Sequence, residues 1–154
     1  MSAYWGRNVL SMIINEFDTL FLDRDGVINV KLDGKYIKDV SQFEFIPGAL
    51  QAINKLNTVF KRIIVVTNQQ GIGKGVMSNL DLKNLHNFML TRININGGEI
   101  ERIYYCPHLV SDDCNCRKPK PGMIQQALDD YPEIDVKYSY LIGDSESDIQ
   151  AGKK

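Results

Sequence analysis

The sequence lacks long apolar runs and a large net charge. None of its apolar segments approaches the ~18 residues that a membrane span requires, and the run at residues 9–14 has no obvious small-residue cleavage site. We therefore expect no membrane partner, no signal peptide and a cytoplasmic location. The formal net charge of −1 gives no electrostatic reason to expect a nucleic-acid partner.

Repeats and low-complexity linkers are also missing. Hydrophobic residues make up 44% and charged residues 24% of the 154 residues, which are ordinary values for a globular domain that buries a core without covalent staples. We expect residues 17–154 to form one domain and residues 1–16 to be an N-terminal extension, with Met12 as an alternative start. Because the last acidic motif lies close to the final residue, a C-terminal truncation stays open.

The cysteines are few, odd in number and clustered. Cys106, Cys114 and Cys116 form, with His108, the pattern Cys-x-His, five residues, Cys-x-Cys. An odd cluster in a chain without a secretory signal argues against a disulfide framework. Three thiolates and one imidazole complete a tetrahedral site for Zn²⁺ with no open position, which predicts structural rather than catalytic zinc. The alternative is a redox-active or incidental cluster.

Short apolar runs alternate with helical patterns along the chain. The runs, which are typical of buried strands in a parallel sheet, span residues 19–22, 62–66, 103–105 and 138–142. Strand–helix alternation implies right-handed crossovers. We therefore expect a doubly wound, Rossmann-like α/β fold with helices on both faces of a mainly parallel sheet.

Three helices are expected between these strands. Pro47 lies in the first turn of the first helix, Ser78 and Asp81 form a capping box at the second, and Pro121 starts the third. The apolar faces, which we interpret as packing surfaces, are Leu50, Ile53, Leu56 and Phe60, then Leu82, Leu85, Met89 and Ile93, then Ile124, Ala127, Leu128 and Tyr131. His86, in the middle of the second helix, is predicted to be a surface or packing residue.

Polar motifs follow the strand-like runs. The stretch Asp23-Arg24-Asp25-Gly26 follows the first run, Thr-Asn-Gln-Gln at residues 67–70 follows the second, and Gly-Asp-x-x-x-Asp at residues 143–148 follows the last. Ligands of open α/β sheets bind beyond the carboxyl ends of the strands, so these motifs should converge on one crevice. Two carboxylates beside a buried strand are costly unless they bind something. For the first stretch alone, a turn closed by Asp and Gly is an equal alternative.

Together the motifs resemble the haloacid dehalogenase-like phosphohydrolase superfamily. Its pattern is Asp-x-Asp-Gly after the first strand, Ser or Thr after the second, a later Lys, and a final Gly-Asp-x-x-x-Asp. The matching residues, within positions 18–151, are Asp23, Asp25, Thr67, Lys118, Asp144 and Asp148. The resemblance implies a Mg²⁺-dependent phosphatase for a small phosphorylated molecule, without a large cap domain.

The acidic residues suit the chemistry that this resemblance implies. Asp23 would attack phosphorus and form an aspartyl phosphate, while Asp25 would protonate the leaving alkoxide and then activate water. Mg²⁺ would be held by Asp23, by Asp144 and by the backbone carbonyl of Asp25. Asp148 would support this metal site.

Uncharged and basic residues complete the expected site. Thr67 would bind phosphoryl oxygens, Lys118 would neutralise developing charge, and Arg117 would grip a second phosphate or hydroxyl groups. The further expected substrate contacts are Asn68, Gln69 and Gln70. Taken singly, Thr67 is better explained as the end of a strand, and Arg117 and Lys118 as solvated charges; together with the two acidic motifs, a functional role is favoured for all three.

Two loops are expected to line the site. Residues 71–75 read Gly-Ile-Gly-Lys-Gly, which fits neither G-x-x-x-x-G-K-[ST] nor G-x-G-x-x-G, so no nucleotide is implied. We expect residues 67–75 to be a strand–helix loop beside the pocket. Residues 31–34 and Tyr36 are expected to cover it.

The zinc loop narrows the resemblance. A Cys/His loop followed by Arg-Lys-Pro resembles the branch that holds D-glycero-D-manno-heptose bisphosphate phosphatases and the histidinol-phosphatase domain. Pro-Gly-Met at residues 121–123 and the stretches 27–29 and 67–72 favour the heptose group, whereas the short zinc loop favours the histidinol group.

Three interpretations therefore stay open. The favoured one is removal of the 7-phosphate from the sugar phosphate D-glycero-D-manno-heptose 1,7-bisphosphate, on the route to lipopolysaccharide or another surface heptose. The alternatives are histidinol-phosphate hydrolysis and a non-catalytic, zinc-stabilised binding domain. The sequence decides neither the preferred anomer nor the oligomeric state.

Overall fold

The computed structural model describes residues 17–153, and the expected extension, residues 1–16, lies outside this part of the chain. The strands are β1 (Phe17–Leu22), β2 (Phe60–Asn68), β3 (Arg102–Cys106) and β4 (Tyr140–Ile142). The α-helices are α1 (Ala49–Leu56), α2 (Asn79–Ile95), α3 (Gly122–Asp130) and α4 (Glu146–Gly152), and the 3₁₀ helices are Val40–Gln42, Val110–Asp112 and Val136–Tyr138.

The strands form one parallel sheet in the order β3-β2-β1-β4. β1 is flanked on both sides, because Leu22 pairs with Val65 of β2 and with Ile142 of β4. The strand order reverses at β1, since β2 and β3 lie on one side of it and β4 returns to the other. The predicted doubly wound fold is confirmed, and the reversal marks the place where such sheets bind ligands.

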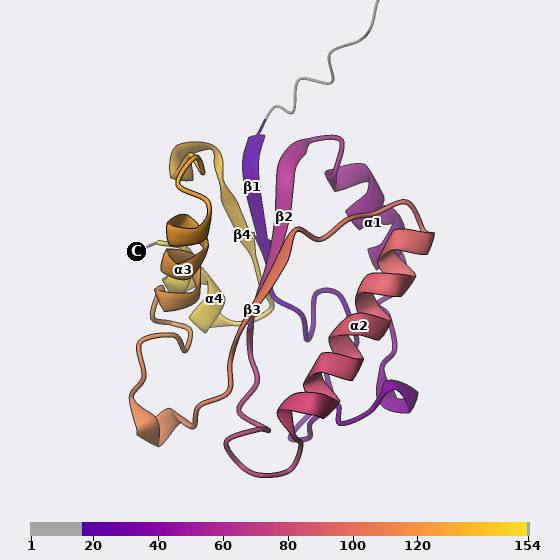
Figure 1. Cartoon of the computed structure of the whole chain (residues 1–154), viewed down its shortest axis with the longest axis vertical. Helices are drawn as coiled ribbons and strands as arrows, with labels where there is room; N and C mark the ends of the chain where they lie inside the picture. Colours follow the sequence, from indigo (N-terminus) through magenta and orange to yellow (C-terminus); the bar gives the residue numbers. More distant parts are fainter. Residues whose placement is uncertain (1–16, 154) are drawn as a thin grey trace, which may run out of the picture.

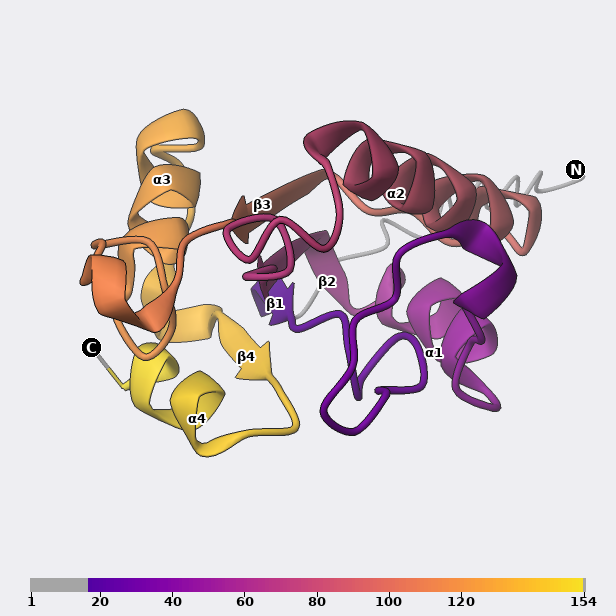
Figure 2. The same ribbon diagram turned by 90° about the horizontal axis from the view of Figure 1, so that it is seen from below.

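Helices cover both faces of the sheet, as Figures 1 and 2 show from two directions. Side chains alternate along each strand, so Leu20 and Leu22 of β1 pack in the core that α1 and α2 cover. Phe21 points the other way and packs with Met123 and Ala127 of α3. Burial of each large apolar side chain stabilises the fold by about 1.5–3 kcal/mol, so these two layers hold the sheet in place.

The helix α2 begins and packs as predicted. The Ser78 hydroxyl accepts a hydrogen bond from the Asp81 N–H (3.1 Å), and the Asp81 carboxylate accepts one from the Ser78 N–H (2.7 Å). The predicted apolar face of this helix is buried and consists of Leu82, Leu85, Met89 and Ile93. A long helix with a fixed start and a buried stripe is therefore a rigid support for whatever lies beside it.

Two predicted details of α1 are wrong. Gly48, whose φ of 86° is left-handed, is the N-cap, so Pro47 precedes the helix instead of lying in its first turn. Phe60 is absent from the helix face, because the helix ends at Leu56 and Phe60 opens β2 opposite Phe17.

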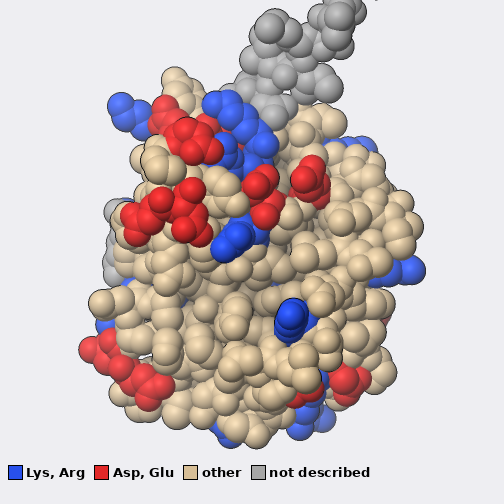
Figure 3. Space-filling view, viewed as in Figure 1, with Lys and Arg blue, Asp and Glu red and all other residues tan. Residues whose placement is uncertain are grey.

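No helix in the described range is both long enough and apolar enough to cross a bilayer. On the face shown in Figure 3, acidic and basic side chains are mixed in the upper part. Two ion pairs of opposite charges connect neighbouring segments, Lys61 with Asp18 (2.9 Å) and Arg62 with Glu133 (2.7 Å). This face therefore presents both signs of charge.

Candidate active site

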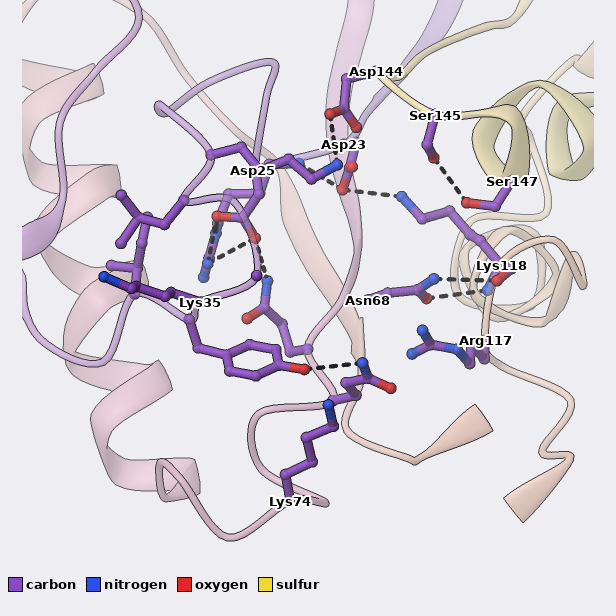
Figure 4. A pocket seen from close by; sticks show the side chains of 18 residues that line it. Asp23, Asp25, Lys35, Asn68, Lys74, Arg117, Lys118, Asp144, Ser145 and Ser147 are labelled. Atoms are coloured by element: carbon purple, nitrogen blue, oxygen red, sulfur yellow. Dashed lines mark hydrogen bonds and ion pairs between the residues drawn. The ribbon is translucent and has the colours of Figure 1, made fainter. Parts of the chain in front are cut away.

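A pocket of about 500 Å³ opens beyond the carboxyl ends of β1, β2 and β4 (Figure 4). The predicted site residues that line it are Asp23, Asp25, Asn68, Gln69, Gln70, Arg117, Lys118 and Asp144. Thr67 and Asp148 are buried behind this lining, with 1% and 0% of their surface exposed. The loop after β1 contributes Lys31 and Tyr36 to the wall, as expected.

Asp23 lies directly after β1 and is held in place by its backbone. Its N–H donates to the carbonyl of Ile142 in β4 (2.9 Å), which joins the ends of the two strands. Its Oδ1 accepts from the Arg24 N–H (2.8 Å) and pairs with Lys118 Nζ (2.9 Å). Burial raises the pKa of Asp23, and the Lys118 charge opposes that rise. A carboxylate fixed at a strand end with a cation beside it is suited to attack an electrophile.

Three carboxyl groups meet at this point. Asp23, Asp144 and Asp148 each present an oxygen within 4.8 Å of the others. Hard oxygen donors with room for water or substrate are the ligand set that Mg²⁺ prefers, so these residues fit that ion. Gly26 makes room for the set: it has a φ of 88°, and a Cβ there would collide with the carboxyl group of Asp144.

Asp148 is the most constrained of the three acids. It lies in the first turn of α4, where its Oδ2 accepts hydrogen bonds from the N–H (3.0 Å) and the hydroxyl (2.5 Å) of Ser145. Its Oδ1 pairs with Lys118 Nζ (2.5 Å). Burial disfavours the Asp148 carboxylate, but Lys118 and Ser145 outweigh that effect and lower its pKa. This geometry suits the supporting role predicted for Asp148.

Lys118 connects the acids to β2. Its ammonium group is 3% exposed, donates to the Val66 carbonyl (2.7 Å) and pairs with both Asp23 and Asp148. Its backbone N–H and carbonyl each form a hydrogen bond of 3.1 Å with the Asn68 side chain. The ammonium group is thus fixed beside the Asp23 carboxylate, where it is suited to balance negative charge on a bound phosphoryl group.

The Asp25 carboxylate faces away from the three-acid cluster. It accepts two hydrogen bonds from Arg24 Nη2 (2.8 and 2.9 Å), one from Asn29 (2.9 Å) and one from Gln69 (2.8 Å). Burial disfavours its charged form, but Arg24 and the amide donors outweigh that effect and lower the pKa of Asp25. Its side chain therefore borders the pocket without adding a fourth carboxylate to the three-acid cluster, which leaves its backbone carbonyl for the predicted metal contact.

The side chains of Gln69 and Gln70, which follow β2 and line the pocket, also form hydrogen bonds with other residues of the site. Gln69 Nε2 donates to Thr67 Oγ1 (2.9 Å) as well as to Asp25. Gln70 Nε2 donates to the Tyr36 hydroxyl (2.9 Å), and Lys74 Nζ lies 5.4 Å from the centre of the Tyr36 ring. The β1 loop is thereby attached to the β2 loop across the pocket.

The predicted zinc ligands converge at the end of β3. The Sγ atoms of Cys106 and Cys116 are 3.5 and 3.2 Å from His108 Nδ1, and Cys114 Sγ is 3.5 Å from each of the other two sulfurs. All three cysteines are free. A zinc tetrahedron with bonds of about 2.0–2.3 Å has edges of about 3.5–3.8 Å, so the set fits Zn²⁺. Because Lys118 follows Cys116 by two residues, an ion here would also order the loop that carries Lys118.

The sequence-based prediction gave Arg24 and His86 no role in the site, and it expected Lys31 only as part of a loop that covers the pocket. Sequence reasoning missed Arg24, although its position between two acids is a signal that a buried cation balances their charge. Lys31, whose Nζ is 2.7 Å from Asp144 Oδ2, belongs to an irregular loop whose path no periodicity encodes. His86, predicted as a surface or packing residue, is buried with its Nε2 3.4 Å from Arg24 Nη1.

Comparisons with known proteins place the pocket in context. The family model described as polynucleotide kinase 3 phosphatase matches residues 17–154. A protein of Mycobacterium tuberculosis named D-glycero-alpha-D-manno-heptose-1,7-bisphosphate 7-phosphatase is 43% identical over 131 residues, which cover 85% of this chain and 69% of that protein. A Pasteurella multocida protein named as the beta-anomer 7-phosphatase is 39% identical over 140 residues, covering 87% of this chain and 74% of that one.

A solved structure shares the same fold. The D,D-heptose 1,7-bisphosphate phosphatase from B. bronchiseptica, complexed with magnesium and phosphate, superimposes with a TM-score of 0.81 at 35% sequence identity. The match covers 87% of this chain and 74% of that one.

Proposed function

The chain belongs to the haloacid dehalogenase-like phosphatases, in the family that includes the heptose-1,7-bisphosphate 7-phosphatases, and we propose that it removes the 7-phosphate of D-glycero-D-manno-heptose 1,7-bisphosphate. The observation that carries this proposal is the convergence of Asp23, Asp144, Asp148 and Lys118 beyond the carboxyl end of β1. A nucleophile, a cation site and a fixed ammonium group are the parts that phosphoryl transfer needs.

The reaction proceeds in two displacements at phosphorus. Asp23 attacks, so that a carboxylate–phosphorus bond forms as the bond to the sugar oxygen breaks, and Asp25, which must first take up a proton from solvent, gives that proton to the sugar oxygen. Asp25 then takes a proton from water. The resulting hydroxide attacks the aspartyl phosphate, which releases inorganic phosphate and restores Asp23.

Mg²⁺ fits beside Asp23. Asp23 and Asp144 would hold the ion through their side chains and Asp25 through its backbone carbonyl, while Asp148 would support the set. When bound, the ion neutralises phosphoryl oxygens and aligns them for attack. Lys118 balances the remaining charge, and Thr67 is proposed to contact a phosphoryl oxygen through its hydroxyl.

We propose that the second phosphate of the substrate binds basic side chains elsewhere on the pocket wall. Lys35, Lys74 and Arg117 line the pocket, and in Figure 4 all three lie below Asp23, with Lys35 on the left, Arg117 on the right and Lys74 at the bottom. A guanidinium group and two ammonium groups suit a second anionic group, which favours a bisphosphate over a monoester. Asn68, Gln69 and Gln70 line the same pocket, and their amide groups are the proposed contacts for the sugar.

The Cys/His cluster is proposed to hold structural Zn²⁺. Its three thiols must stay reduced to bind the ion, which supports a reducing compartment such as the cytoplasm. The product would feed the synthesis of lipopolysaccharide or another surface heptose.

Phosphate release in the presence of Mg²⁺ tests the proposal. The substrates are the α and β anomers of heptose 1,7-bisphosphate, histidinol phosphate and an oligonucleotide with a 3′-phosphate, and Asp23→Asn is the blank. We expect release of one phosphate per heptose bisphosphate and little from the others. A preference for histidinol phosphate or the oligonucleotide would reassign the substrate, and no release above the blank would refute a phosphatase.

A further inference from the structure

A buried chain of three polar side chains runs from the pocket into helix α2. Arg24 has 1% of its surface exposed, so its guanidinium group depends on protein partners for its hydrogen bonds. Its Nη2 bonds both oxygens of Asp25 (2.8 and 2.9 Å), and its Nε lies 3.3 Å from Asp25 Oδ1. Its Nη1 reaches the other way, to His86 Nε2 at 3.4 Å.

His86 is held as firmly as the arginine that it contacts. It is 8% exposed, and its ring packs edge-on against Tyr105, with 6.1 Å between ring centres. Because Arg24 only donates hydrogen bonds, His86 Nε2 must accept, which requires a neutral ring with its proton on Nδ1.

We propose that His86 is a positioning residue for the reaction: its Nε2 holds the guanidinium of Arg24, which in turn fixes the orientation of the Asp25 carboxylate at the pocket wall. This inference rests on the proposed phosphatase function. Of the donors on Asp25, Arg24 alone binds both oxygens, so the angle of the carboxylate follows the angle of the guanidinium plane. Asn29 binds Oδ1 and Gln69 binds Oδ2, so both share in fixing this orientation, and Arg24 links it to helix α2 through His86.

The geometry makes a specific prediction about leaving groups. A sugar alkoxide is a poor leaving group and needs a proton from Asp25, whereas 4-nitrophenolate leaves without one. A displaced Asp25 should therefore slow attack on the sugar phosphate much more than attack on 4-nitrophenyl phosphate. A residue that only fills the core would slow both alike.

The test compares His86→Phe, which keeps the ring but removes the acceptor, with His86→Gln, which keeps an acceptor. Asn87→Ala, at the exposed neighbouring position, is the control. The readout is kcat/KM for heptose 1,7-bisphosphate and for 4-nitrophenyl phosphate, since it reports the steps up to the aspartyl phosphate. We expect His86→Phe to lower the sugar-to-aryl ratio at least about tenfold, and His86→Gln and Asn87→Ala to keep it within about threefold of wild type.

An unchanged ratio in a folded His86→Phe protein would overturn the inference. Wild-type protein that releases phosphate from neither substrate would instead count against the proposed function. NMR chemical shifts of the ring nitrogens provide a readout that needs neither variant nor turnover. We expect a neutral His86 with an unprotonated Nε2 at neutral pH, and a proton on Nε2 would also overturn the inference.

Discussion

Asn68 clamps the backbone of Lys118: its amide oxygen accepts from the Lys118 N–H and its amide nitrogen donates to the Lys118 carbonyl, both at 3.1 Å. The end of β2 is thus tied by two hydrogen bonds to the loop that carries Lys118. The clamp holds the backbone of Lys118, while Asp23, Asp148 and the Val66 carbonyl hold its ammonium group.

Replacement of Asn68 by Asp tests the clamp. The change keeps the shape but turns a donor into an acceptor that faces the Lys118 carbonyl, so we expect kcat to fall about tenfold or more. Asn57→Asp is the matched control, because Asn57 forms the same two bonds with the backbone of Glu99 far from the pocket. Both variants should lose about 1–2 kcal/mol of unfolding free energy in urea. Equal kcat values for the two would show that the clamp is merely structural.

Removal of the Lys118 charge should lower kcat much more than removal of the nearby Lys120 charge. In Lys118→Met, Asp23 and Asp148 keep their burial but lose their shared cation, and we expect kcat to fall at least about 100-fold. Lys120→Met serves as the control, since Lys120 pairs with Asp113 outside the pocket. Phosphate release at saturating substrate measures both. A loss below about threefold in Lys118→Met would contradict the role assigned to the ammonium group.

Gly26→Ala should weaken the cation site. The new Cβ would collide with the Asp144 carboxyl group, so we expect a higher Mg²⁺ concentration for half-maximal activity. Gly48→Ala controls for backbone strain, because Gly48 has a similar φ of 86° and nothing within 4 Å of its Cβ. Each change should cost roughly 1–2 kcal/mol of stability. Identical Mg²⁺ curves would rule out the steric effect.

Zinc should stabilise the loop after β3. We expect purified protein to contain about one zinc per chain, and Cys114→Ser or a strong chelator to lower both zinc content and the melting temperature. Activity should fall with them, because the loop also carries Lys118. Ser111→Ala, an exposed change in the same loop, should alter none of the three. Metal analysis that finds no zinc in active protein would refute this expectation.

His86 should make stability depend on pH. Burial, helped by the Arg24 charge and opposed by Asp25, lowers the pKa of His86 to about 3. A base with a lowered pKa contributes stability that is complete above its unfolded pKa of about 6.5 and is lost as the pH falls toward 3. Wild type should therefore lose about 2 kcal/mol more than His86→Gln between pH 7 and pH 5. Urea denaturation at both pH values measures this change. If the free energy of unfolding fell equally with pH in the two proteins, the predicted contribution of His86 would be excluded.

The sequence predicted the site best where residues adjoin strands. Asp23 and Asp144 each come directly or almost directly after a strand, and a parallel sheet brings such ends together whatever the loops do. The cysteine cluster was equally predictable, because three thiols and an imidazole within a short loop have few other uses. Thr67 shows the limit, since it lies within β2 rather than after it, and its buried, Gln69-bonded side chain could not be foreseen.

Side-chain direction was beyond the sequence. The turn of Asp25 toward Arg24 depends on Asn29 and Gln69, which arrive from two different loops. The contact between Arg24 and His86 depends on where α2 crosses the sheet. Phe60 was misassigned for a similar reason. An apolar residue one turn beyond a helix fits either the helix face or the next strand, and here pairing with Phe17 of β1 places it in the strand.

The hydrogen bond from the Asp23 N–H to the Ile142 carbonyl also has a consequence for the order in which the site is assembled during synthesis. Asp23 directly follows β1, whereas the strand that completes its setting, β4, begins only at Tyr140. β1 and β2 can pair early on the ribosome, but β4 joins them only across a long stretch of intervening chain, and such distant pairings form slowly. A nascent chain would therefore carry Asp23 and its motif well before β4 can join β1 and bring Asp144 beside Asp23.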